Sequence, residues 1–153
     1  MRICTIGFRG KLARQFFTLL QEAGVQKVLD IRRKNQSQLA GFTKGRDLEF
    51  FLDECFGIQY EHIPLLAPSE DLLKEYRRRL GRKKRDDAVW AYYVDCFGAE
   101  IAQRPVVGRF NEATVGLDVV CLLCSEETAD CCHRRLIAEH VAERIEGIVI
   151  EHL

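Results

Sequence analysis

The stretch RICTIGFRGKLARQFFTLLQEAGVQKVLDI (residues 2–31) decides the fold class. Residues 2–7 form an apolar run that ends at a glycine, which is typical of a buried strand. In the next segment apolar residues recur at helical spacing as far as Ala23, and Gly24 marks the end of a helix. Residues 26–31, QKVLDI, supply a second strand. The stretch therefore predicts a right-handed strand-helix-strand unit whose two strands pair in parallel.

The rest of the chain continues this alternation after a polar loop over residues 32–46. Further helices are expected over residues 47–57 with Asp47 as the N-cap, 69–80 with Ser69 as the N-cap, 86–104 with Trp90, Val94, Phe97 and Ile101 in the core, and about 131–146. Further strands are expected over residues 58–63, 117–124 and 148–153, whereas residues 106–116 show no clear pattern. We expect one α/β domain over residues 1–153, with a mainly parallel sheet flanked by helices in a Rossmann-like three-layer arrangement.

The composition is that of a globular protein, with 47% hydrophobic and 30% charged residues. Arginines interrupt the short apolar runs near the N-terminus, so the pattern of a signal peptide is missing, and no later run is long enough to span a membrane. Seven cysteines at irregular spacing make a poor disulfide framework. We expect a cytoplasmic protein with reduced thiols, no membrane association and no resident cofactor.

The net charge of zero conceals an uneven distribution. Residues 1–45 contain nine Lys and Arg and two acidic residues, whereas residues 110–153 contain three Arg and nine acidic residues. The run KEYRRRLGRKKR (residues 74–85) has eight cations in twelve positions. Such a run is either a solvated helix end or a surface that binds phosphates, so a non-enzymatic nucleic-acid-binding or regulatory module is one hypothesis.

The ends of the predicted strands collect polar and glycine residues. Ligands of parallel α/β sheets bind beyond the carboxyl ends of the strands, so we expect these residues to converge. They are Gly7, Phe8 and Arg9 after the first strand, Asp30 and Arg32 after the second, His62 after the third, and Cys124, Ser125 and Glu126 after the fourth. Asp30 either orients Arg32 or acts as a base, and Arg32 is suited to hold an anion.

The segment LLCSEETADCCHRR (residues 122–135) follows with a second group of reactive residues. Cys121 and Cys124 lie three positions apart on a strand, so their thiols point to opposite faces and do not share a metal. A mixed set of Cys124, Cys132 and His133, with Asp30 or His62 as a fourth ligand, remains an alternative metal site. A phosphatase-type loop is excluded because the sixth position after Cys124 is Asp130 rather than Arg.

Thr128 or Asp130 is expected to cap the helix that follows Cys124. That cap would place Cys131, Cys132, His133 and Arg134 in the first helical turn, where free amides and the helix dipole favour anions and lower the pKa of a thiol.

The chain resembles the domain of unknown function 488 family, which consists of small bacterial and archaeal α/β proteins. The resemblance runs from Thr5 to Leu153 and rests on Thr5-Ile6-Gly7, Asp30-Ile31-Arg32, Ser37, Gly41-Phe42, Gly57-Ile58-x-Tyr60 with His62 and Pro64, Leu123-Cys124-x-Glu126, Cys132-His133-Arg134 with Ile137-Ala138, and His152-Leu153. The family has no settled activity. Carried over by position, the resemblance points to Gly7, Asp30, Arg32, Phe42, Tyr60, His62, Cys124, Glu126, Cys132, His133 and Arg134 as shared positions. The segments RRKNQSQLAGF and PLLAP depart from the family pattern, which carries a Pro after the Asp-x-Arg pair and a Leu-Gly-Gly after the Tyr.

The leading hypothesis is an enzyme or binding domain for a phosphate-bearing substrate, either a nucleotide or a nucleic acid. The expected catalytic residues are Asp30 and Glu126 as acid or base, Cys124 or Cys132 as nucleophile, and His133. The expected substrate-binding residues are Gly7, Arg9, Arg32, Tyr60, His62 and Arg134. Whether the protein is an enzyme, its reaction and its oligomeric state are left open by the sequence.

Overall fold

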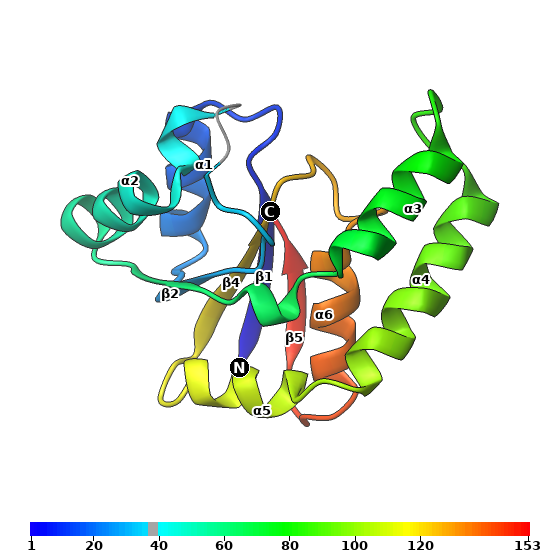
Figure 1. The fold of residues 1–153 in the computed structure, drawn as a ribbon. Helices are drawn as coiled ribbons and strands as arrows, with labels where there is room; N and C mark the ends of the chain where they lie inside the picture. The colour runs from blue at the N-terminus through cyan, green and yellow to red at the C-terminus, as the bar shows by residue number, and fades with distance from the viewer. Residues whose placement is uncertain (37–39) are drawn as a thin grey trace.

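The computed structural model describes residues 1–36 and 40–153. Five strands form an all-parallel sheet with the order β3-β2-β4-β1-β5 (Figure 1). The strands are β1 (Arg2–Gly7), β2 (Lys27–Asp30), β3 (Gln59–His62), β4 (Val119–Cys124) and β5 (Val149–His152). The predicted α/β class, with a parallel sheet between layers of helices, is confirmed. Ser37, one of the positions behind the family resemblance, lies outside the described residues.

One detail of the predicted topology is wrong: β1 and β2 are parallel but are not neighbours. β4 lies between them, and Cys4 of β1 and Val28 of β2 both face Cys121 of β4 in the register. The reason is the composition of β4, whose sequence VVCLLC is apolar at every position and almost wholly buried. A strand of that kind is stable only in the centre of a sheet that is covered on both faces.

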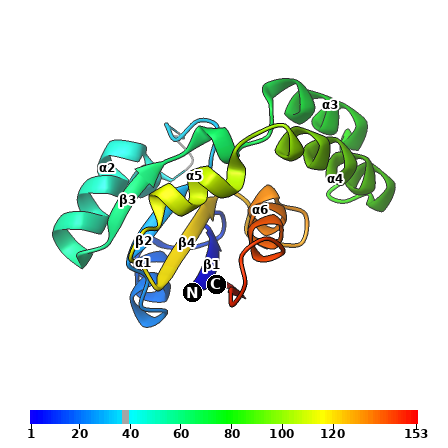
Figure 2. The same ribbon diagram turned by 90° about the horizontal axis from the view of Figure 1, so that it is seen from below.

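The helices cover the two faces of the sheet unequally (Figure 2). One face is covered by α1 (Ala13–Glu22) and by α2 (Gly45–Phe50) with its π-helical continuation Phe51–Cys55. The other is covered by α3 (Glu70–Leu80), α4 (Asp87–Ala102), α5 (Val106–Ala113) and α6 (His133–Ala142). Short 3₁₀ turns over Gly41–Thr43 and Pro64–Leu66 lie in the connections.

Each face has its own apolar core, as the alternation of side chains along a strand requires. On β4, Cys121 and Leu123 pack with α1 and α2, whereas Val120 and Leu122 pack with α4, α5 and α6. Phe97 and Ile101 of α4 are buried as predicted, and Trp90 is only partly buried.

The helix boundaries confirm some of the predicted caps and correct others. Ser69 caps α3 by accepting a hydrogen bond from the Leu72 amide. α2 begins at Gly45 rather than after an Asp47 cap, which leaves Asp47 in the first turn. α6 begins at His133 with Cys132 at the N-cap, so neither Thr128 nor Asp130 caps it. Residues 125–131 instead form an irregular loop, and the undecided stretch 106–116 contains α5.

No described helix is both long and apolar enough to cross a lipid bilayer.

Candidate functional site

A cavity of about 630 Å³ opens at the carboxyl edge of the sheet. Its floor comes from the end of β4 and the start of α6, and its walls come from the segments after β1 and β2 and from the α3–α4 hairpin. The lining residues are Arg9, Arg32, Arg33, Lys34, Glu70, Leu73, Lys74, Tyr76, Arg77, Leu80, Lys84, Trp90, Tyr93, Cys124, Ser125, Glu126, Cys131, Cys132 and His133. Seven of these are Lys or Arg and two are Glu, so the cavity is strongly cationic.

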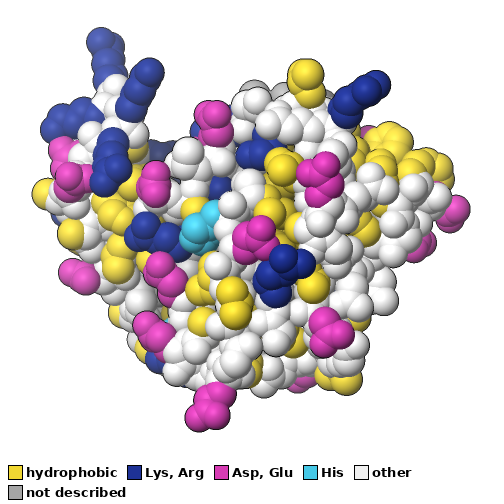
Figure 3. Space-filling model, turned by 180° about the vertical axis from the view of Figure 1, so that it is seen from behind, with side chains coloured by type: hydrophobic (Ala, Val, Ile, Leu, Met, Phe, Trp, Pro, Cys, Tyr) yellow, Lys and Arg dark blue, Asp and Glu magenta, His cyan; other side chains and the backbone are white. Residues whose placement is uncertain are grey.

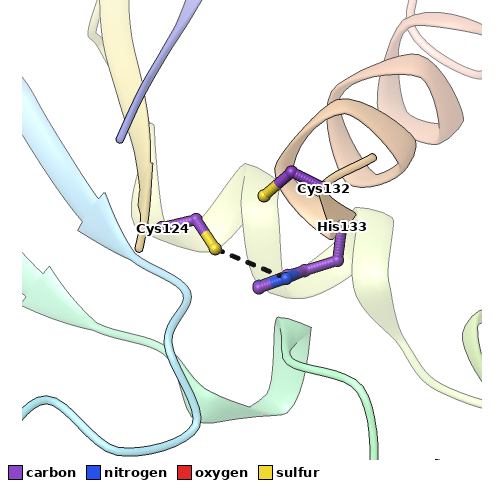
Figure 4. Close-up of side chains that lie close together, drawn as sticks. All are labelled: Cys124, Cys132 and His133. Carbon is purple, nitrogen blue, oxygen red and sulfur yellow. Dashed lines mark hydrogen bonds between the residues drawn. The ribbon is translucent and has the colours of Figure 1, made fainter. Parts of the chain in front are cut away.

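Cys124 and His133 form a thiol–imidazole pair on the cavity floor (Figure 4). Cys124 is the last residue of β4 and is 4% exposed, and His133 is the first residue of α6. The Sγ–Nδ1 distance is 3.5 Å, and His133 Nε2 lies 3.0 Å from the carbonyl oxygen of Ile31. A carbonyl only accepts, so Nε2 carries a proton and the neutral ring presents the lone pair of Nδ1 to the sulfur.

The surroundings of Cys124 favour its thiolate. Its pKa is lowered, most strongly by a hydrogen bond from the Cys132 thiol, and further by the backbone amides of Glu126 and Ser125 and by the charge of Arg134, against the opposing effect of burial. The pKa of Cys132 is raised well above its usual value, because this thiol keeps its proton to donate to Cys124 and because it is buried. Of the two thiols, Cys124 is therefore the nucleophile candidate.

Arg134 lies behind the cavity floor and does not line the cavity. Its side chain is 1% exposed and donates from Nη1 to the Glu126 carbonyl at 2.5 Å and from Nη2 to the Glu127 carbonyl at 3.2 Å. Nη1 also lies 3.7 Å from Cys132 Sγ. Among the described residues no carboxylate forms an ion pair with Arg134. A buried charge of this kind needs a compensating charge, and a thiolate at Cys124 provides one.

Asp30 holds Arg32 at the edge of the cavity. Arg32 Nε and Nη2 donate to the two Asp30 oxygens at 2.8 and 2.6 Å, and Nη2 also donates to the Thr43 carbonyl at 2.8 Å. The Tyr60 hydroxyl donates to Asp30 at 2.7 Å, and burial together with the Asp30 charge raises the pKa of Tyr60. Arg32 is 3% exposed, lines the cavity and stacks over the Phe8 ring at 5.3 Å.

One nitrogen of Arg32 remains unused. Nη1 is buried and has no hydrogen-bond partner among the described residues, although the rest of the guanidinium is fully engaged. An unsatisfied buried donor on a charged group costs about 1–3 kcal/mol or more. Arg134 Nε and Arg135 Nε, which do not line the cavity, are also buried without a hydrogen-bond partner among the described residues.

The other predicted residues lie around this centre in supporting positions. His62 Nε2 donates to the Arg32 carbonyl at 2.7 Å and does not line the cavity. Arg9 and Glu126 pair at 2.9 Å on the exposed rim. Gly7 lies beneath the loop after β4, where a Cβ atom would overlap the Glu126 carbonyl and crowd Arg134. Direct roles for Gly7, Tyr60, His62 and Arg134 in binding substrate therefore stay predictions, and their contacts are those of positioning residues.

The sequence missed the second wall of the cavity. Tyr76 of α3 and Trp90 and Tyr93 of α4 form an aromatic surface, in which the Trp90 and Tyr93 rings stack at 5.1 Å and 17°. Helical spacing placed Trp90 in the core, and it does pack against the core while its exposed part lines the cavity. Only the nearby basic run pointed to this region in the sequence.

The proposed metal ligands also come together in part. One ligand atom from each of Cys124, Cys132 and His133 lies within 4.8 Å of the others. Within the described ranges, neither Asp30 nor His62 joins this group. The oxygens of Asp30 are occupied by Arg32 and Tyr60.

A family profile described as domain of unknown function DUF488 matches residues 12–141 of the 153-residue chain. The chain belongs to the DUF488 family. The DUF488 match includes the site from Asp30 to Arg134 and leaves Gly7 and Arg9 outside, so it is shorter than the resemblance from Thr5 to Leu153. Searches among curated proteins and solved structures found no match.

Proposed function

We propose that this chain is an enzyme that binds a phosphate-bearing substrate in the cationic cavity and uses Cys124 as its nucleophile. The observation that carries the proposal is that Cys124, His133 and Arg32 line one cavity. The Cys124–His133 pair offers a nucleophile, and Arg32 Nη1 offers a buried donor without a partner. Anion binding and nucleophilic attack need these two groups side by side.

Binding depends on charge that is already in place. The bidentate pair with Asp30 fixes the Arg32 guanidinium before substrate arrives, so little side-chain entropy is lost on binding. Arg33 and Lys34 follow it on the same segment, and Lys74 and Arg77 face them from α3. A phosphate group would neutralise part of this excess of cations.

The chemistry follows from the thiol–imidazole pair. The Cys124 proton passes to Nδ1 of His133, whose ring is anchored through Nε2 to the Ile31 carbonyl. The thiolate attacks an electrophilic centre of the substrate, a bond forms to Sγ, and the leaving group departs with its electron pair and takes the proton from Nδ1. Water then hydrolyses the covalent intermediate with His133 as the general base.

Alkylation of cysteines tests this proposal, with peptide mapping to separate the thiols. Cys124 should react with iodoacetamide at a pH below that of an ordinary thiol, and with anionic iodoacetate relatively faster than the exposed Cys55 does, because the cavity is cationic. Inorganic phosphate should protect Cys124 and leave Cys55 unaffected. The variant His133→Gln should slow alkylation of Cys124 at neutral pH, because it removes the imidazole nitrogen that accepts the thiol proton.

The proposal is lost if Cys124 and Cys55 share one pH profile and one preference between the two reagents. It is also lost if phosphate at high concentration gives Cys124 no protection.

A zinc site is a second candidate, because Cys124, Cys132 and His133 converge and a carbonyl anchors the remote nitrogen of His133, as is usual for metal-bound histidines. The charge balance is less favourable: two thiolates neutralise Zn²⁺ and leave the buried Arg134 without compensation. Elemental analysis of protein purified without added metal distinguishes the two. One zinc per chain, lost in Cys132→Ser, would establish the metal site, and a content near zero would exclude it.

A further inference from the structure

The α3–α4 hairpin carries the strongest concentration of positive charge in the chain. Residues 74–85 contain eight Lys and Arg and form the end of α3 and the turn that leads to α4. The hairpin projects beyond the sheet at the side of α6 (Figure 1), and Lys and Arg side chains crowd its tip in Figure 3, at the upper left. A solvated helix end does not require so many cations at one place.

Part of this charge is neutralised within the hairpin and part is free. Lys74 pairs with Asp71, and Arg78 and Arg79 both pair with Glu75. Lys83 pairs with Asp86 and Arg85 with Asp87. Arg77, Arg82 and Lys84 have no ion-pair partner among residues 1–36 and 40–153. Two of these free cations, Arg77 and Lys84, line the cavity.

Cations line the cavity on two sides, and aromatic rings lie beside those of the hairpin. Lys34 is paired with Glu70 of α3. Arg33 and Lys34 lie on the side of β2, and Lys74, Arg77 and Lys84 lie on the side of the hairpin. Tyr76, Trp90 and Tyr93 form the wall beside the hairpin cations, with the Tyr76 and Tyr93 rings 4.8 Å apart. Positive charge that follows a backbone, beside aromatic rings that receive bases, is the arrangement used by proteins that bind single-stranded nucleic acids.

We infer that the substrate is a single strand of nucleic acid whose backbone runs along the hairpin cations while one nucleotide enters the cavity. The inference rests on the proposed function, since that nucleotide would lie over Cys124. A cavity of about 630 Å³ suits a group of nucleotide size, and its aromatic wall is reached only by an unstacked base. A duplex keeps its bases stacked and would contact the hairpin alone.

Trp90 provides a direct test because it is the only tryptophan in the chain and it lines the cavity. We expect oligodeoxythymidylate of about 12 nucleotides to quench the Trp90 fluorescence and to bind in a fluorescence-anisotropy titration. Inorganic phosphate should not quench it. Affinity should fall between about 50 and 200 mM salt, with a log–log slope of about −2 to −3 if three or four phosphates are contacted.

Paired charge reversals locate the binding surface. The double variant Arg77→Glu/Lys84→Glu should weaken binding by about 10- to 100-fold and make the salt slope shallower. The matched control Arg14→Glu/Arg46→Glu reverses two exposed cations on α1 and α2, which cover the opposite face of the sheet, and should bind as the wild type does. Circular dichroism should be unchanged for both, because all four side chains are exposed.

The inference is overturned if the oligonucleotide neither binds nor quenches at about 50 mM salt, if a duplex of equal length binds more tightly than the single strand, or if the control variant loses as much affinity. The alkylation of Cys124 is measured separately. A reactive, phosphate-protected Cys124 without oligonucleotide binding would leave the proposed function standing and remove only the nucleic-acid substrate.

Discussion

Cys121 and Cys124 lie only three residues apart on the same strand, yet they point to opposite faces of the sheet and their environments differ. Cys121 is fully buried in the core beneath α1, beside Cys4. Burial raises the pKa of Cys121 well above its usual value, and burial together with Glu151 raises the pKa of Cys4 to about 11. Cys124 is almost as buried, but its pKa is lowered. The first is a small core residue and the second is a candidate nucleophile.

Burial alone therefore does not decide the reactivity of a thiol in this chain. In the middle of β4 the backbone amides are used in the sheet, and Cys121 packs in the apolar core beneath α1. At the end of β4 the ladder stops, and the amides of Ser125 and Glu126 are free to donate to the Cys124 sulfur. The same break makes room for Cys132 and His133 at the start of α6. The pKa of a thiol is lowered where the regular backbone pattern of β4 ends.

The largest effect on stability is expected when Arg32→Ala, beside the cavity of Cys124, is compared with Phe16→Ala, in the core that contains Cys121. Both should destabilise the protein by about 3–5 kcal/mol, the first because it leaves Asp30 buried without its partner and the second because it leaves a cavity beneath α1. Only Arg32→Ala should abolish the protection of Cys124 by phosphate. Urea unfolding and the alkylation assay measure the two effects. Equal loss of protection in Phe16→Ala would show that the two faces are not functionally separate.

A smaller effect is expected from replacing two glycines, Gly7 beneath the loop after β4 and Gly98 in α4. Gly7→Ala should cost about 1–3 kcal/mol and slow the alkylation of Cys124, since the new Cβ would push the Glu126 carbonyl and Arg134 away from their places. Gly98→Ala, in α4 with open space around it, should instead stabilise the protein by about 0.5–1 kcal/mol and leave alkylation unchanged. If both substitutions behave alike, the close approach at Gly7 does not support the site.

The smallest effect is the dependence of stability on pH. A pKa for Cys124 below the ordinary 9.0 means that the native state releases this proton first, so unfolding takes up a proton between the lowered value and 9.0. The stability of the wild type relative to Cys124→Ser should therefore rise with pH in that window. The raised pKa of Cys121 has the opposite sign, and stability relative to Cys121→Ser should fall above 9.0. Urea midpoints across this range check both slopes, and a shared sign would remove the contrast.

Several features of the site were accessible from sequence because they depend on local rules. The offset of three residues on a strand predicted that Cys121 and Cys124 point to opposite faces, and in the structure Cys121 packs in the core beneath α1 whereas Cys124 lines the cavity. The rule that parallel strands present their carboxyl ends at one edge brought Arg32, Cys124 and Glu126 to a common cavity. The sequence also predicted a role for Gly7 at the end of the first strand. Gly7 leaves room for the Glu126 carbonyl and the Arg134 guanidinium, and it does not line the cavity.

Other features were not accessible because they depend on partners far apart in the chain. The insertion of β4 between β1 and β2 arises from competition among strands for the centre of the sheet, which no local pattern records. The start of α6 at His133 was missed because Arg134 holds the Glu126 and Glu127 carbonyls and keeps the preceding loop out of the helix.

The sequence by itself determined the alternation of strands and helices, the residues at the strand ends and the basic run, since each follows from the spacing of side chains along one segment. Only the tertiary structure decided which of these residues share a cavity. It placed the α3–α4 hairpin opposite Arg32 and buried Arg134 behind the floor of the cavity. It also brought the Cys132 thiol to a position from which it donates a hydrogen bond to Cys124. The physical reason is that charge compensation and thiol acidity depend on distances in space, and those distances are fixed only when both faces of the sheet are packed.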